Sequence, residues 1–185
     1  ATAPAARLDH LALGIAAELR GRIDAAGTLD ELDRLGTELA TAIAAARART
    51  PEEEAAVCAE LLADTYGFEG DEEEYDHPDN SMLDLVVARR VGLPILVSTV
   101  YTEVARRAGV KLEGVGLPGH YVVGHFGVDP PLLLDPFDGG CRVDGEVERE
   151  HLRAWSAHET AMRMLNNLVG SYERRLAALN YTLAH

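Results

Sequence analysis

Cysteine is scarce in this sequence, and long apolar runs are absent. Cys58 and Cys141 are the two cysteines in 185 residues, which is too few for a disulfide framework. No apolar run approaches the ~20 residues that a membrane-spanning helix needs. No secretory leader is visible either, so we expect a soluble, cytoplasmic protein.

Basic charge is also in short supply. Asp and Glu outnumber Lys and Arg by 31 to 17, which gives a formal net charge of -14. Such a chain repels phosphate groups, which argues against nucleic acid and anionic membranes as partners. The acidity could favour a basic partner, although a charge of this kind commonly serves solubility alone.

The first half of the chain has helical periodicity. Apolar residues recur at intervals of three and four from Leu8 to Ile23, a pattern that predicts an amphipathic helix ended by Gly27. Thr28 and Glu31 then predict the capping box of a second helix.

A third helix should begin at Thr50-Pro51, where a capping hydroxyl precedes a proline in the first turn. Residues 67–80 form an acidic loop, which is commonly a solvated surface. At its end, Asp79 or Asn80 is predicted to cap a further helix that runs to about Val91.

The middle of the chain changes from helical to strand periodicity. Pro94 opens a helix that ends at Gly109 and is apolar on most faces, so we expect it to be buried. Three short strands with brief connections follow and favour an antiparallel meander, at 112–117, 120–126 and 132–134. Helices near 147–155 and from 158 onward should complete an α+β fold.

A histidine at one strand start and an aspartate at another strand end suggest a specific chemistry. In thiol acyl-transfer enzymes, a helix N-terminus stabilises the cysteine thiolate, a neighbouring His exchanges its proton, and an acid fixes the His tautomer. His120 and Asp135 could be the last two members of such a site. The spacing alone is weak, because a structural His at a strand start is more common than a catalytic one.

Six ordered motifs between residues 66 and 140 carry a family resemblance. They are Asp79-Asn80-Ser81, Arg89-Arg90, Gly92-Leu93-Pro94-Ile95, residues 103–107 (Glu-Val-Ala-Arg-Arg), Gly119-His120 and Asp135-Pro136-Phe137. Together they resemble the SirB-type transglutaminase-like family of bacteria. Its members are described as regulators of SirC expression and often carry tetratricopeptide-like helices after the domain.

The resemblance implies a papain/transglutaminase-like core and places His120 and Asp135 at the His and Asp positions of the site. It also exposes a departure, because the slot for the nucleophilic cysteine falls at Ile95 or Leu96, which cannot attack a carbonyl. Ser98 lies close by, but a serine deep in an apolar helix more often bonds a backbone carbonyl one turn back. Cys141 follows the Asp turn instead of opening the helix.

Four other residues are candidates for lining the cleft, and each has a structural reading beside the functional one. Asn80 is expected to cap a helix. Arg90 and Glu103 are expected to form an internal ion pair. Gly119 should permit a tight turn beside the strand. No metal ligands or cofactor motif are predicted, since acids such as Asp76 and Asp79 in a loop usually face water.

These residues lead to three hypotheses about function. The first is a transglutaminase-like pseudoenzyme that acts as a regulatory or protein-interaction module. The second is a cryptic acyl-transfer or hydrolytic enzyme that uses His120 and Asp135 with Ser98, Cys141 or water. The third is a small-molecule-binding module in the remnant cleft. The predicted organisation is a helical layer at 1–65, a core at 66–156 and a helical extension at 157–185.

Overall fold

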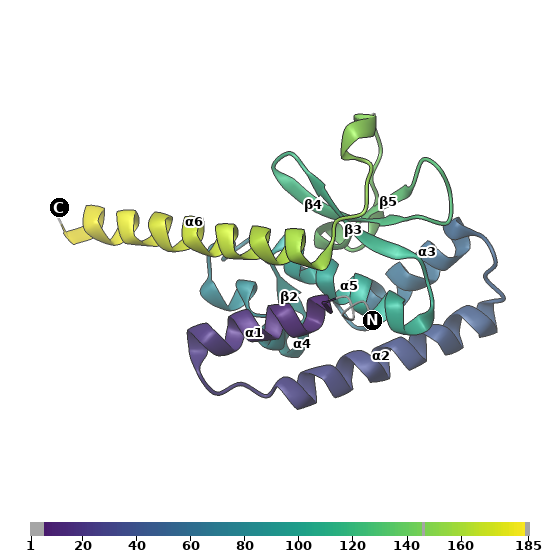
Figure 1. Ribbon diagram of the computed structural model, residues 1–185, viewed down its shortest axis with the longest axis horizontal. Coiled ribbons are helices and arrows are strands. Elements are labelled where there is room, and N and C mark those ends of the chain that lie inside the picture. The colour runs from purple at the N-terminus through teal and green to yellow at the C-terminus, as the bar shows by residue number, and fades with distance from the viewer. Residues whose placement is uncertain (1–5, 146, 184–185) are drawn as a thin grey trace, which may run out of the picture.

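The computed structural model describes residues 6–145 and 147–183 and has an α+β architecture, with helices packed around a small sheet (Figure 1). Within this part of the chain, no helix is both long enough and apolar enough to cross a bilayer. The helices are α1 (Leu8–Arg20), α2 (Ala25–Ala46), α3 (Pro51–Ala59), α4 (Leu83–Arg89), α5 (Pro94–Ala108) and α6 (Ala157–Leu183).

The main sheet has four antiparallel strands in the order β3-β4-β5-β6. A tight turn joins β3 to β4, and Gly119 occupies it with a φ of 72°, a conformation that glycine adopts without steric cost. A separate pair, β1 (Glu69–Gly70) and β2 (Val91–Gly92), is parallel. The strands of the main sheet are β3 (Leu112–Leu117), β4 (His120–His125), β5 (Leu132–Asp135) and β6 (Cys141–Arg142).

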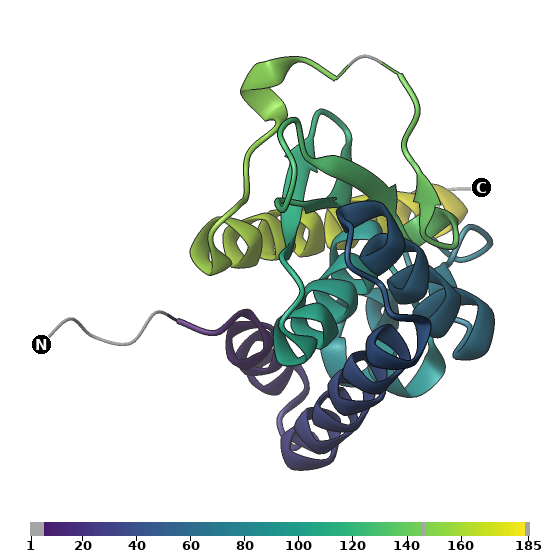
Figure 2. The same cartoon turned by 90° about the vertical axis from the view of Figure 1, so that its right-hand side faces the viewer.

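Helix α5 is the centre of the hydrophobic core. Every residue from Pro94 to Ala105 is buried, because α2 covers one side of the helix and β3 and β4 cover another. Alternation along β4 sends Tyr121 and Val123 into this core, whereas Val122 joins a smaller apolar cluster on the other side of the sheet. Figure 2 shows the sheet between the helical layer and a protruding segment that includes the 3₁₀ helix Arg149–His151.

Local signals predicted several boundaries correctly. Thr50 and Glu53 form a reciprocal capping box at α3, which continues through a π-helical turn over Glu60–Thr65. Helix α5 begins at Pro94 and ends before Gly109, whose φ of 80° suits a left-handed cap. The division of the chain at residues 65 and 156 stays a prediction.

The predicted boundary between the first two helices is wrong. Helix α1 ends at Arg20, where Gly21 adopts a φ of 78°, and α2 already begins at Ala25. The Asp24 carboxylate caps α2 by accepting the Gly27 amide, and the Thr28 hydroxyl donates back to the Asp24 carbonyl. An aspartate cap four residues upstream therefore replaces the predicted Thr28–Glu31 box.

The predicted helix over 147–155 is also wrong, since the structure has only the 3₁₀ turn Arg149–His151 there. Val147 and Leu152 instead pack against the apolar cluster on the outer face of the sheet. The Trp155 amide donates to the Gly114 carbonyl of β3 at 2.9 Å. Burial against the sheet thus holds this segment in an extended path that a helix could not follow.

Candidate functional site

The structure brings His120 and Asp135 into direct contact, as the strand order predicted. His120 is the first residue of β4 and Asp135 the last of β5, and the His120 Nε2–H donates to Asp135 Oδ2 at 2.6 Å. The imidazole is 34% exposed and the carboxylate 20%. Within residues 6–145 and 147–183, the second ring nitrogen, Nδ1, has no hydrogen-bond partner. The pair therefore has the hydrogen-bond geometry of the last two members of a triad.

Asp135 is fixed by a second hydrogen bond. Its Oδ1 atom accepts the Phe137 amide at 3.0 Å, which caps the 3₁₀ turn Pro136–Asp138. The Gly140 amide also donates to the Asp135 carbonyl at 2.8 Å, so the chain folds tightly back to β6. With both carboxylate oxygens engaged, the orientation of the acid toward His120 is set by the turn itself.

Phe137 forms one wall beside the pair. Its ring lies edge-on to the His120 ring, at 6.4 Å between centroids and 88° between planes, and near Tyr75 at 6.0 Å. Gly70 in β1 makes this packing possible, because a Cβ there would lie 2.2 Å from the Phe137 ring. No local pattern marks Gly70, which in the sequence is one glycine inside the acidic loop.

Arg163 of α6 holds the β3–β4 turn from outside, and no local pattern in the sequence marks this residue either. Its guanidinium donates to the Leu117 carbonyl at 3.2 Å and to the His120 carbonyl at 2.9 Å. The same group lies 5.6 Å from the ring centroids of Tyr121 and Trp155. Arg163 therefore positions the backbone that carries the imidazole, although 43 residues separate the two in sequence.

The start of α5 offers no nucleophile. Ile95 and Leu96 are 0% and 1% exposed and belong to the core. Ser98 is fully buried, and its hydroxyl donates weakly to the Tyr121 carbonyl at 3.4 Å. That partner is on β4, and not the carbonyl one helical turn back that we predicted. The structure brings Ser98 to the backbone of β4 and gives it no bond to the His120 imidazole.

The two cysteines lie in contrasting environments. Cys58 of α3 is fully buried, and this burial raises its thiol pKa to about 12, so it stays protonated at neutral pH. Cys141 is exposed on β6, where it is the register partner of Asp135. Cys141 is thus the accessible thiol nearest in the sheet to the His–Asp pair, but it lies on a strand and not at a helix N-terminus.

Comparison with known proteins identifies the family to which this chain belongs. A model of the transglutaminase-like superfamily matches residues 26–169. The chain belongs to the transglutaminase-like superfamily. A UPF0162 protein of Xylella fastidiosa is 45% identical over 87 residues, which cover 47% of this chain and 31% of that protein. A UPF0162 protein of Pseudomonas aeruginosa is 30% identical over 175 residues, 87% of this chain and 63% of that protein.

A eukaryotic protein shares part of this transglutaminase-like region. F-box only protein 21 of Mus musculus is 36% identical over 78 residues, which cover 42% of this chain and 12% of that protein. This chain spans about a third of the Xylella relative and less than two thirds of the Pseudomonas relative. No solved structure matches the chain.

Asn80 does not cap a helix, so the predicted cap is wrong. Helix α4 begins at Leu83 without a side-chain cap, and His77 accepts the Asp79 amide in the preceding 3₁₀ turn. Asn80 is fully buried and joins three segments of the transglutaminase-like domain. Its amide group donates to Asp71 Oδ2 and to the Glu74 carbonyl, and its oxygen accepts from Arg89. Asn80 thereby anchors the acidic loop to α4.

The predicted pairing of Arg90 with Glu103 is also wrong. Arg90 bonds Glu31 of α2 at 2.5 Å and lies over the Phe68 ring at 4.7 Å. Glu103 instead bonds Arg107 at 2.7 Å inside a buried cluster that also contains Asp9. Arg90 and Glu103 therefore belong to separate ion pairs, and tertiary packing decided their partners.

Possible metal ligands in the described residues lie away from the His–Asp pair. Glu148, Glu150 and His151 have ligand atoms within 4.8 Å of one another, but they sit on the protruding segment and both acids are exposed. Asp76 is occupied by a salt bridge to Arg174 at 2.6 Å.

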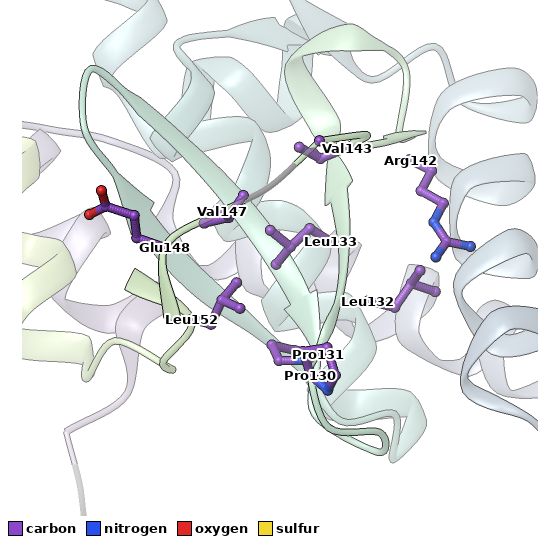
Figure 3. A pocket seen from close by; sticks show the side chains of 10 residues that line it. Pro130, Pro131, Leu132, Leu133, Arg142, Val143, Val147, Glu148 and Leu152 are labelled. Atoms are coloured by element: carbon purple, nitrogen blue, oxygen red, sulfur yellow. The ribbon is translucent and has the colours of Figure 1, made fainter. Parts of the chain in front are cut away.

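The hollow shown in Figure 3 is distinct from the His–Asp pair. It has a volume of about 610 Å³ and lies against the outer face of the sheet, where Leu133, Val143 and Leu152 line it. Neither His120 nor Asp135 lines this hollow. A second hollow of about 640 Å³ adjoins the turn after Asp135 and is lined by Phe137, Cys141 and several acids of residues 64–73.

Proposed function

We propose that this transglutaminase-like domain is a pseudoenzyme, with a regulatory or protein-interaction role in the cytoplasm. The observation that supports the proposal is an oriented His120–Asp135 pair without a nucleophile at the helix start, where Ile95 and Leu96 are buried. A triad without its nucleophile loses nearly all covalent catalysis. A pair of this kind can persist because breaking it leaves polar groups unsatisfied, at a cost of ~1–3 kcal/mol.

A competing proposal is a hydrolase or acyltransferase, and the free Nδ1 of His120 favours it. That nitrogen belongs to a ring that is 34% exposed, so it can reach water or a substrate. Such an enzyme would activate water, or it would use the exposed Cys141. The third proposal, a small-molecule binder, would place its ligand against the same imidazole and Phe137.

An ester and amide hydrolysis screen separates these proposals. We expect no turnover from the wild type above the level of His120→Ala, with both variants shown to be folded by circular dichroism. His151→Ala is the matched control, because its side chain has a similar exposure of 31% and lies on the protruding segment. Turnover that a folded His120→Ala protein loses and His151→Ala keeps would establish the enzyme. Cys141→Ser and Ser98→Ala would then identify the nucleophile.

Thiol reactivity provides a second test. Iodoacetamide should label Cys141 at the rate of an ordinary exposed thiol and should leave Cys58 unmodified in the native state, because burial raises the Cys58 pKa to about 12. Fast labelling of Cys141 that does not change with pH would mark an activated thiolate and contradict the pseudoenzyme. The small-molecule proposal has its own test. A metabolite that raises the melting temperature of the wild type but not of His120→Ala would support a ligand site at the imidazole.

A further inference from the structure

The hollow that adjoins the turn after Asp135 is lined by carboxylates. It has a volume of about 640 Å³, and no Lys, Arg or His is among the described residues that line it. Its walls come from residues 64–73, from Val91 of β2 and from the turn 137–141. We name it the acidic hollow, after the carboxylates in its lining: Asp64, Glu69, Asp71, Glu72, Glu73 and Asp138.

Most of these carboxylates have no partner. Asp71 accepts from the Asn80 amide group and lies 3.5 Å from the Arg89 guanidinium. Within residues 6–145 and 147–183, the other five side chains make no hydrogen bond and no salt bridge. Like charges around a concave surface concentrate a negative potential there, so a cation that enters the hollow interacts with several of them at once.

An unpaired hydroxyl behind the wall of the hollow is a second, independent sign of a ligand. Tyr101 of α5 is fully buried, and its hydroxyl has no partner among the described residues. The hydroxyl points at the turn that lines the hollow, because a Cβ on Gly140 would lie 3.0 Å from it. Burial raises the pKa of Tyr101, and the charges of its neighbours, Asp64 among them, add to the rise. Since an unpaired buried hydroxyl is costly, this one marks a place for a hydrogen-bonding group of a ligand.

The carboxylates are spread too widely for a single metal ion. In the part of the chain that the structure describes, no three of them bring ligand atoms within 4.8 Å of one another. Charges distributed along a hollow instead match a chain of positive groups. Arginine also suits the Phe137 ring in the lining, because a guanidinium pairs with carboxylates through two parallel hydrogen bonds and stacks on aromatic rings.

We infer that the acidic hollow binds an arginine-rich segment of a partner protein. The inference names the partner of the interaction role proposed above, and it rests on that role. One guanidinium has five N–H donors, so it can bind Asp64 and still donate to the Tyr101 hydroxyl. Further arginines of the segment pair with the exposed Glu72 and Glu73.

A segment bound in this way lies beside the imidazole. Phe137 lines the acidic hollow, and its ring is edge-on to the His120 ring at 6.4 Å between centroids. Cys141 lines the same hollow and is the register partner of Asp135. The partner therefore contacts the turn that orients Asp135, which gives a site without a nucleophile a role in recognition.

Fluorescence anisotropy of a labelled hexa-arginine peptide tests the inference on the full chain. At about 50 mM NaCl the binding should be saturable, and at about 300 mM NaCl it should be roughly tenfold weaker, because salt screens the charges. Hexa-lysine should bind about threefold more weakly than hexa-arginine, since an ammonium group makes neither the paired hydrogen bonds nor the aromatic stacking.

Two variants locate the binding in the acidic hollow. Glu72→Gln/Glu73→Gln should weaken it about tenfold, because the substitutions remove two unpaired charges from the lining. The matched control, Glu18→Gln/Asp30→Asn, removes the same charge from exposed positions on α1 and α2 and should change the affinity less than about twofold.

Tyr101→Phe tests the hydroxyl without changing any charge. It should weaken hexa-arginine binding about threefold, because one hydrogen bond to the guanidinium is lost. The ring that packs in the core is kept and the hydroxyl that is removed has no partner, so the variant should stay folded. Circular dichroism verifies the fold of all three variants.

Four outcomes would overturn the inference. They are no saturable binding, an equal loss in the matched control, an unchanged affinity in Tyr101→Phe, and displacement of the peptide by CaCl2 more strongly than by NaCl of equal ionic strength. The last would identify a divalent-cation site. The hydrolysis screen tests the proposed function separately, because absent binding with no turnover removes only this inference, whereas turnover by the wild type removes the pseudoenzyme.

Discussion

Strand β4 carries a histidine–carboxylate pair at each end, and the two pairs differ in what they leave free. At its start, His120 bonds Asp135 at 2.6 Å with one nitrogen, and its side chain is 34% exposed. At its end, His125 bonds Glu54 of α3 at 2.8 Å, its other nitrogen accepts the Gly127 amide, and its side chain is 3% exposed. Both ring nitrogens are therefore hydrogen-bonded in His125, whereas one ring nitrogen stays free in His120.

This comparison shows which histidine the packing needs. The His125 ring is buried with both nitrogens engaged, so its removal leaves a cavity and breaks two hydrogen bonds. His120 has one free nitrogen at the surface, so the packing depends on it less. A histidine with a free nitrogen beside a fixed acid is the one that can exchange a proton with a substrate, whether or not the chain uses it.

His125→Ala should give the largest loss. We expect about 3 kcal/mol of destabilisation, chiefly because the substitution removes a buried ring and leaves a cavity, with the loss of two hydrogen bonds as a smaller contribution. Urea unfolding followed by circular dichroism measures the change. A loss no greater than that of His120→Ala would show that the contrast between the two ends does not hold.

The buried ion cluster that joins α1 to α5 should make the stability of the fold sensitive to acid. Burial alone would raise the pKa of Asp9, but hydrogen bonds from Arg7 and Arg107 hold that pKa well below its usual range. The unfolded chain then takes up this proton first, so the stabilisation is complete above about pH 4 and is lost as the pH falls further.

Asp9→Asn should therefore cost about 2 kcal/mol at neutral pH, because it removes the charge from a buried ion pair. Its stability should also fall less steeply with acid than that of the wild type. Urea midpoints between about pH 2 and pH 7 measure both effects. Parallel curves for the two proteins would show that Asp9 is not the source of the acid sensitivity.

His120→Ala should cost about 1 kcal/mol, since the ring is partly exposed and only one hydrogen bond is lost. The expected result is a modest fall in melting temperature with an unchanged fold. This variant is the matched counterpart of His125→Ala on the same strand. A loss above that of His125→Ala would mean that His120 holds the sheet end together.

Asp135→Asn should be the mildest change, at roughly 0.5 kcal/mol. The amide oxygen can still accept the Phe137 amide, which keeps the turn after β5 in place. The melting temperature should therefore lie between those of the wild type and His120→Ala. If the melting temperature of Asp135→Asn falls further than that of His120→Ala, the carboxylate stabilises the fold through the turn after β5 more than through its bond to His120.

The fold and the pair were predictable because their signals are local. Pro94 and Gly109 delimit α5, and the change to strand periodicity after it places His120 and Asp135 on neighbouring strands. The cap at Thr50 follows from adjacent residues too. These features depend on residues close in the sequence, which is where patterns carry information.

The remaining features depend on contacts between distant segments. Arg90 pairs with Glu31 across 59 positions, and Arg163 reaches His120 across 43. The role of Gly70 appears only when Phe137 is packed against it. Asn80 had a good local reading as a cap, but burial gave its side chain three other partners. No local pattern encodes such partners.

Arg163 has a mechanical consequence. Its guanidinium ties α6 to the Leu117 and His120 carbonyls, so a displacement of this helix along its axis pulls on the turn that carries the imidazole. Anything that shifts α6 therefore also shifts the backbone at His120, because Arg163 connects the two. Arg163→Leu should release the turn from α6, and amide exchange at His120 and Tyr121 should then be faster in the variant than in the wild type.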